Sequence, residues 1–222
     1  MANEKLGRVR AFVFDLDGTL IDSKMDLVHA VNAMLRTTGR PKQGAELVAS
    51  YIGHGAPQLI ASVLGPASTD EERREALAVF LKEYEKRMLT LTCSYPGVEE
   101  GLRALRGFPM AVLTNKPLKM AMEILHGLAL VNYFDVIYGG DSFTKKKPDP
   151  EGARTILHKF GVAPEEAAMV GDSDVDVQMA RNAGMVSVEV HYGFGVRDPK
   201  LFPADVCVER LAELLLLTAI KA

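Results

Sequence analysis

The sequence has little of what would place it in a specialised class of protein. Its 222 residues include two cysteines, Cys93 and Cys207, which provide neither a disulfide framework nor the spacing of zinc ligands, so both are interpreted as reduced thiols. Neither sign of charge dominates, because 26 lysines and arginines stand against 29 aspartates and glutamates, for a net charge of −3. Nucleic-acid binding through phosphates needs a basic surface, and this balance argues against it.

Long hydrophobic runs are also missing. No stretch approaches the roughly 18 apolar residues of a membrane-spanning helix. The apolar run near the start is too short, before charge intervenes, for a secretory signal peptide. The sequence therefore predicts a cytoplasmic protein with no membrane and no nucleic-acid partner, and it leaves the oligomeric state open.

What the sequence does contain is a series of short apolar segments that precede helical patterns. Six segments predict strands, at residues 9–14, 110–115, 134–141, 167–172, 186–190 and 204–209. Strands that alternate with helices are typical of an α/β fold with a parallel sheet. We therefore expect a doubly wound, Rossmann-like parallel sheet, built from residues 1–22 and 94–222.

Residues 23–93 have a different pattern and predict an all-helical domain inserted after the first strand. The segment 25–39 predicts a helix whose apolar stripe is formed by Leu27, Val28, Val31 and Leu35. A later helix begins with the capping-box pair Thr69 and Glu72. Its apolar residues recur at helical spacing, at Leu77, Leu81, Tyr84, Met88 and Leu91.

Polar residues stand where several of the predicted strands end. These residues, together with one lysine from the loop "KKKPDP", are Asp15, Asp17, Thr114, Asn115, Lys147, Asp172 and Asp176. Ligands bind beyond the carboxyl ends of the strands in open parallel sheets, so these groups are expected to share one crevice. An Asp-Gly pair is also a common turn, but a turn would explain only the first strand end and not the others.

This set of side chains indicates phosphoryl transfer. Carboxylates confined in a crevice repel each other unless a cation lies between them, and hard oxygen ligands suit Mg²⁺. A carboxylate beside such an ion can attack phosphorus and form an aspartyl-phosphate. A second acid can then protonate the leaving oxygen and later deprotonate a water molecule. A lysine and a hydroxyl would stabilise the charge on the phosphoryl oxygens.

The same residues resemble the four motifs of the haloacid dehalogenase-like phosphatases, in the same order. "DLDGTL" resembles the first motif and "LTN" the second, while "KKKPDP" and "GDSDVD" resemble the third and fourth. The resemblance implies that Asp15 is the nucleophile and that Asp17 is the general acid and base. It also implies that Thr114 and Lys147 bind the transferred phosphoryl group.

The resemblance further implies a Mg²⁺ cofactor. Its protein ligands would be the side chains of Asp15 and Asp172 and the backbone carbonyl of Asp17. Asp176 would support the metal site rather than bind the ion.

Residues 23–93 resemble the cap domain that this family inserts after the first strand, and a cap holds the leaving group. The loop in "YIGHGAPQLI" leads into a helix, and the amides at such a helix start favour anions. Gly53, His54 and Gly55 are therefore candidate substrate contacts, as are Thr19 and Asn115. The loops resemble those of phosphoglycolate phosphatases, which implies a small phosphorylated metabolite, 2-phosphoglycolate, as the substrate.

Other functions remain open at this point. Another small phosphorylated metabolite would serve the same motifs, and a β-phosphoglucomutase-like sugar phosphomutase would differ only in the cap. A phospho-receiver domain would lack the helical insertion. A dehalogenase needs no metal, and the second aspartate and the paired acids argue against it.

Overall fold

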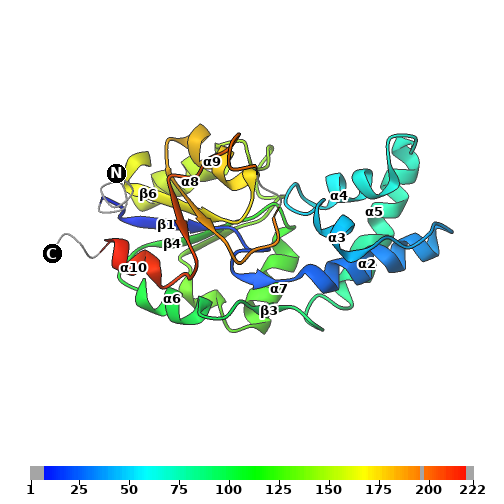
Figure 1. The fold of residues 1–222 in the computed structure, drawn as a ribbon, viewed down its shortest axis with the longest axis horizontal. Coiled ribbons are helices and arrows are strands. Elements are labelled where there is room, and N and C mark those ends of the chain that lie inside the picture. Colours follow the sequence, from blue (N-terminus) through cyan, green and yellow to red (C-terminus); the bar gives the residue numbers. More distant parts are fainter. Residues whose placement is uncertain (1–7, 196–197, 219–222) are drawn as a thin grey trace.

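The computed structural model describes residues 8–195 and 198–218. Within them, six strands form one parallel sheet in the order β5-β4-β1-β6-β7-β8 (Figure 1). The strands are β1 (Ala11–Phe14), β4 (Met110–Leu113), β5 (Val136–Tyr138), β6 (Ala167–Gly171), β7 (Val186–Val190) and β8 (Val206–Val208). All six predicted strands are confirmed. Because β1 is central and the chain winds outward from it in both directions, the sheet is doubly wound, and its ligand crevice is expected beyond the end of β1.

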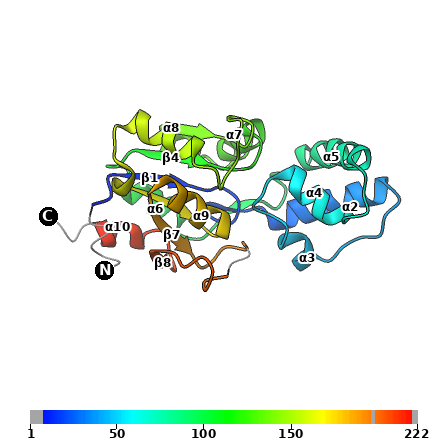
Figure 2. The same ribbon diagram turned by 90° about the horizontal axis from the view of Figure 1, so that it is seen from above.

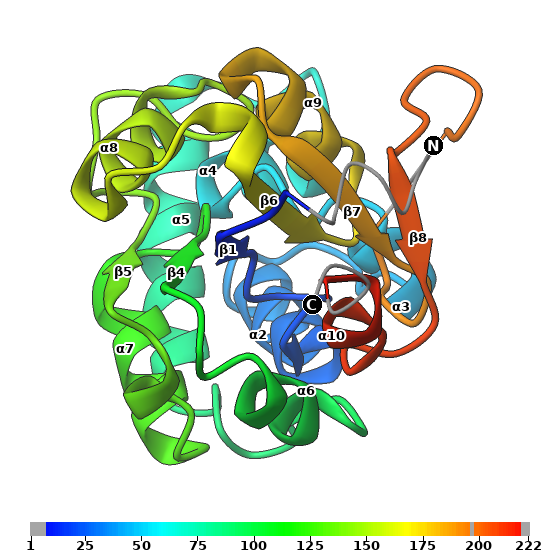
Figure 3. The same cartoon turned by 90° about the vertical axis from the view of Figure 1, so that its left-hand side faces the viewer.

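Helices cover both faces of the sheet, because successive residues of a buried strand point to opposite sides. On β1, Phe12 and Phe14 belong to the larger apolar core, whereas Ala11 and Val13 belong to the other. The larger core includes residues of α6 (Val98–Ala104), α7 (Leu118–Gly127) and α10 (Glu213–Thr218). The other includes residues of α8 (Glu151–Phe160) and α9 (Asp174–Ala183) (Figure 3). Two 3-10 turns, η1 (Val131–Tyr133) and η2 (Pro164–Glu166), join these elements.

The predicted helical insertion is present and forms a lobe beyond the carboxyl ends of the strands (Figures 1 and 2). It contains α2 (Lys24–Thr37), α3 (Ala45–Ala49), α4 (Ala56–Leu64) and α5 (Asp70–Glu85). The chain enters through β2 (Ile21–Asp22) and returns through β3 (Cys93–Ser94), which form an antiparallel pair. The return is fixed by the buried Asp26, whose carboxylate accepts hydrogen bonds from the amides of Leu91 and Thr92 at 2.9 and 2.8 Å.

The helix α5 is shorter than the sequence predicts. Its capping box is present, since Thr69 and Glu72 exchange hydrogen bonds between side chain and backbone. The helix ends at Glu85, however, so neither Met88 nor Leu91 is part of its apolar stripe. Met88 is still buried, whereas Leu91 is 52% exposed. The amides near Leu91 bond to the carboxylate of Asp26 instead, and this tertiary contact replaces the helical pattern that spacing alone predicts.

The described residues contain no helix that is both long enough and apolar enough to cross a membrane.

Candidate active site

The carboxyl ends of β1, β4 and β6 bring most of the predicted site residues together. Asp15 follows β1, Thr114 follows β4 and Asp172 follows β6, and all three side chains are buried. The amide of Asp15 donates to the carbonyl of Val170 at 2.9 Å, which fixes the end of β1 against β6. The structure therefore places these three groups around one crevice, as the topology of the sheet predicts.

Three carboxylates and one ammonium form the buried centre of the crevice. Asp15, Asp172 and Asp176 each offer one oxygen, and these atoms lie within 4.8 Å of one another. The ammonium nitrogen of Lys147 lies 2.8 Å from Asp15 Oδ1 and 2.7 Å from Asp176 Oδ1. The other oxygen of Asp176 accepts hydrogen bonds from the amide and the hydroxyl of Ser173 at 3.2 and 2.7 Å. Asp176 is thus engaged on both oxygens, which suits a supporting role.

The charges in this centre do not balance. Burial, followed by the neighbouring Asp176 carboxylate, raises the pKa of Asp15 to about 6 despite the opposing effect of Lys147. Burial and the charges of Asp176 and Asp15 hold the pKa of Asp172 well above its ordinary value. Three carboxylates around one ammonium leave negative charge that is costly to bury, and a cation with hard oxygen ligands would relieve it. The donor set therefore fits Mg²⁺.

A glycine-rich segment that the sequence analysis did not single out holds Asp172. The amides of Phe194 and Gly195 donate to Asp172 Oδ2 at 3.1 and 2.7 Å. Gly18 has a φ of +84°, and a Cβ there would collide with the carboxylate of Asp172. Only glycine combines this backbone conformation with this close approach. Gly193 and Gly195, two glycines separated by one residue, the first of them three residues past the end of β7, were the available sequence signal for the segment.

Asp17 is held by residues that the sequence analysis also missed. The Lys116 ammonium lies 2.8 Å from both of its carboxylate oxygens, and the Ser23 hydroxyl also donates to it. Lys116 lies over the ring of Tyr84, 4.6 Å from the ring centroid. Burial alone would lower the pKa of Lys116, but the Asp17 carboxylate raises it above its ordinary range. Tyr84 comes from α5, so this cluster joins the insertion to the sheet.

Three further predicted site residues, Asn115, Thr114 and Thr19, make hydrogen bonds to other protein groups. The amide of Asn115 donates to the carbonyls of Gly53 and Lys147 at 2.9 and 3.1 Å, and its oxygen accepts from the Lys147 amide at 3.0 Å. The hydroxyl of Thr114 accepts from the Lys116 amide at 3.2 Å. Thr19 donates its hydroxyl to Asp172 Oδ1 at 3.3 Å. Their contacts with substrate stay predictions.

A hollow lies between the insertion and the sheet, next to Asp15 and Asp17. Its polar lining includes Thr114, Asn115 and Lys116, and Gly53 and Gly55 border it at the start of α4. Its apolar lining includes Leu27, Ile52, Leu59, Phe80, Leu81 and Met120. The side chain of His54 is exposed. The hollow therefore offers an anion a helix start and a buried ammonium within an apolar wall.

The chain is similar in sequence to proteins that are already known. The sequence model of the haloacid dehalogenase-like hydrolases matches residues 12–190. A phosphoglycolate phosphatase of Chromobacterium violaceum is 39% identical, over 94% of this chain and 96% of the relative. A phosphoglycolate phosphatase of Pseudomonas putida is 42% identical, over 83% of this chain and 70% of the relative.

Solved structures show the same overall fold. The crystal structure of a predicted phosphoglycolate phosphatase from Haemophilus somnus 129Pt has a TM-score of 0.89 and 31% identity. It covers 95% of this chain, and this chain covers 98% of it. A predicted phosphatase from Clostridium acetobutylicum has a TM-score of 0.82 and 26% identity, and the match covers 94% of this chain and 97% of that one.

Proposed function

This chain belongs to the haloacid dehalogenase-like hydrolase family, and we propose that it hydrolyses phosphoric monoesters through an aspartyl-phosphate intermediate, with Mg²⁺ as cofactor and 2-phosphoglycolate as substrate. The observation that carries this proposal is the position of Asp15. Its buried carboxylate lies 2.8 Å from Lys147 and within 4.8 Å of two further carboxylates, beside the hollow between the insertion and the sheet.

The first step is attack by a carboxylate oxygen of Asp15 on phosphorus. The new O–P bond forms as the bond to the leaving oxygen breaks, and the phosphoryl group passes to Asp15. Lys147 stabilises negative charge on the phosphoryl oxygens, and we assign the same role to the hydroxyl of Thr114. Asp15, Asp172 and the carbonyl of Asp17 would hold Mg²⁺, which when bound supplies positive charge that polarises a phosphoryl oxygen.

Asp17 moves the proton in both steps. As an acid it protonates the leaving oxygen, and the alcohol departs. As a base it then takes a proton from a water molecule, whose oxygen attacks phosphorus and releases inorganic phosphate from Asp15. Before substrate binds, the contacts that Asp17 makes with Lys116 and Ser23 hold its carboxylate beside the hollow.

The hollow supports a leaving group that carries a carboxylate. Lys116 supplies a buried ammonium, and the start of α4 at Gly55 supplies amide dipoles that favour anions. The Tyr84 hydroxyl is buried and makes no hydrogen bond within the described residues, so it is a further donor for such a group. A substrate carboxylate that pairs with Lys116 would replace Asp17 as its partner and release Asp17 for proton transfer. This exchange favours 2-phosphoglycolate over a neutral phosphate ester.

Residues 23–93 then act as the cap domain, and residues 1–22 with 94–222 as the phosphatase core. The cap supplies Tyr84 and the Gly53–Gly55 loop, while the core supplies the reacting carboxylates. Because the two domains have these different roles, the side of the hollow formed by the insertion is mostly apolar, whereas the catalytic charges come from the core.

Phosphate release tests the proposal. Purified protein with Mg²⁺ should release inorganic phosphate from 2-phosphoglycolate faster than from 2-hydroxyethyl phosphate, which has a hydroxymethyl group in place of the carboxylate. A chelator should abolish both activities, and Mg²⁺ should restore them. Interconversion of sugar phosphates without phosphate release would instead identify a phosphomutase. Full turnover in metal-free buffer would contradict the assignment of the cofactor.

A further inference from the structure

The outer strands β7 and β8 carry a column of polar side chains on one face. The valines of both strands point into the larger core, so the alternate residues share the opposite face. Glu189 on β7 stands directly opposite Cys207 on β8. His191 follows Glu189 by two residues, at the end of the strand, and its amide donates to the carbonyl of Val208 at 3.1 Å. Parallel pairing therefore brings together groups that lie 16 or more residues apart in the sequence.

Three of these side chains converge with the geometry of metal ligands. One atom each of Glu189, His191 and Cys207 lies within 4.8 Å of the others. His191 Nε2 is 3.7 Å from Glu189 Oε1, a separation wide enough for an ion that is bound to both atoms. His191 is about one-third exposed, at 36%, and Cys207 is exposed, so solvent reaches the site and can supply a fourth ligand.

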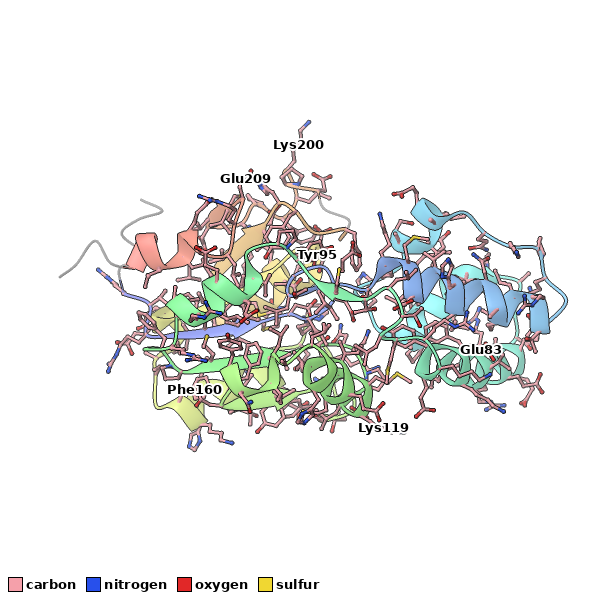
Figure 4. The ribbon with its side chains drawn as sticks, turned by 90° about the horizontal axis from the view of Figure 1, so that it is seen from below. Glu83, Tyr95, Lys119, Phe160, Lys200 and Glu209 are labelled. Atoms are coloured by element: carbon pink, nitrogen blue, oxygen red, sulfur yellow. The ribbon has the colours of Figure 1, made fainter. Side chains whose placement is uncertain are left out.

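A fourth residue orients the imidazole. His191 Nδ1 lies 2.7 Å from Glu209 Oε1, and because a carboxylate accepts, the imidazole donates from Nδ1. With the proton on Nδ1, the Nε2 atom, which lies 3.7 Å from Glu189 Oε1, keeps a lone pair that can bind a metal. Histidines that bind metals generally make such a second contact to a carboxylate, which fixes their tautomer and ring orientation. Glu209 is labelled in Figure 4, on the outer edge of the sheet.

We propose that Glu189, His191 and Cys207 bind a borderline-soft divalent cation, Zn²⁺, at a surface site separate from the active centre. A thiolate, an imidazole and a carboxylate are together the donors that Zn²⁺ prefers, whereas Mg²⁺ selects oxygen alone. The carboxylate cluster around Asp15 has no sulfur or nitrogen donor except the ammonium of Lys147, which cannot bind a cation. The two sites therefore select different metals.

The test uses Co²⁺ as a spectroscopic substitute for Zn²⁺ on the full-length, reduced, metal-stripped protein. Cobalt bound to a thiolate gives a charge-transfer absorption that cobalt bound to carboxylates lacks, so the active centre does not contribute to the signal. We expect one equivalent of Co²⁺ to develop this absorption and Zn²⁺ to abolish it by displacement. An excess of Mg²⁺ should leave it unchanged.

Matched variants locate the site. Cys207→Ser should lose the absorption, and Glu209→Ala should weaken cobalt binding about 10–100-fold, the usual effect of removing such an orienting carboxylate. Cys93→Ser is the control, because Cys93 is the other exposed thiol of the chain and lies on β3; it should keep the absorption and the affinity. Circular dichroism establishes that each variant is folded. A folded parent protein without the absorption, or an absorption that survives Cys207→Ser, would overturn the proposal.

Discussion

Replacing Lys116 by methionine should remove the preference for a carboxylate-bearing substrate. Methionine keeps an unbranched side chain against Tyr84 but removes the ammonium that lies 2.8 Å from both oxygens of Asp17. Loss of one partner of a buried charge pair costs about 2–5 kcal/mol. In the empty enzyme Lys116 already pairs with Asp17, so a substrate carboxylate gains only the difference between the two pairings.

That difference sets the expected size of the effect. We expect about 1.5–3 kcal/mol of lost discrimination, which is roughly a 10–100-fold decrease in the ratio of kcat/KM for 2-phosphoglycolate to kcat/KM for 2-hydroxyethyl phosphate. Steady-state phosphate release on both substrates measures the ratio. Lys119→Met is the matched control, because Lys119 (labelled in Figure 4) lies three residues further on, in the first turn of α7, but is exposed and pairs with Glu85. It should leave the ratio unchanged.

An equal decrease in kcat/KM for the two substrates in Lys116→Met would contradict the proposal that Lys116 binds the carboxylate of the substrate. Lys116 would then act only through Asp17, as a group that positions the acid, and the carboxylate of the substrate would bind elsewhere. A second measurement separates this outcome from misfolding. Because the variant leaves Asp17 without its ammonium, its free energy of unfolding should fall by about 3 kcal/mol, and Asp17→Asn in the same chain should recover part of that loss.

Three further predictions concern the nucleophile, the metal and the loop of the insertion. After a rapid quench with an activated aryl phosphate, intact-mass measurement should find one added phosphoryl group on Asp17→Asn and none on Asp15→Asn; equal labelling would contradict the assigned roles. Because the pKa of Asp15 is raised to about 6, the metal-free protein should lose stability as the pH rises through that value. Since Mg²⁺ binds the deprotonated carboxylates, the increase in Tm that it produces should be larger at about pH 7.5 than at about pH 5, and a pH-independent increase would exclude these ligands. Gly55→Asp should impair hydrolysis of 2-phosphoglycolate more than that of an aryl phosphate, because the added carboxylate repels an anionic leaving group; equal losses would remove the loop from substrate recognition.

The sheet and the centre of the site were predictable from the sequence because both follow from local patterns. A parallel strand that is buried on both faces is a short apolar run, and all six runs became strands of one sheet. Since parallel strands end at a common edge, the polar residues that follow them meet there. This rule alone was enough to predict that Asp15, Thr114 and Asp172 lie in one site.

The surroundings of Asp17 were not predictable in the same way. Ser23, Tyr84 and Lys116 come from segments that are 30 or more residues apart, and each looks ordinary where it stands in the sequence. Lys116 directly follows the second motif, but its ammonium bonds to Asp17, which is 99 residues away in the sequence. Only the packing of α5 over the crevice brings Tyr84 to it. Long-range contacts of this kind have no periodic signature.

The end of α5 was also not predictable from the local sequence. Helical spacing continues through Leu91, and nothing in that segment marks an end at Glu85. The segment that returns after the helix bonds instead to Asp26, which lies 65 residues before Leu91 and offers the amides of Leu91 and Thr92 a buried carboxylate. Amides that bond to a buried carboxylate are satisfied without a helix, so the tertiary contact prevails over the local pattern.

The contacts between the insertion and the sheet explain how leaving-group recognition can affect catalysis. The Asn115 amide bonds both to Gly53 in the insertion and to the carbonyl of Lys147, whose ammonium lies against Asp15. Lys116, the next residue, joins Tyr84 of the insertion to Asp17. Two adjacent residues after β4 therefore connect the leaving-group side of the hollow to the nucleophile and to the acid. A shift of the insertion changes the positions of both groups at once, so a poorly fitting leaving group should lower kcat as well as raise KM.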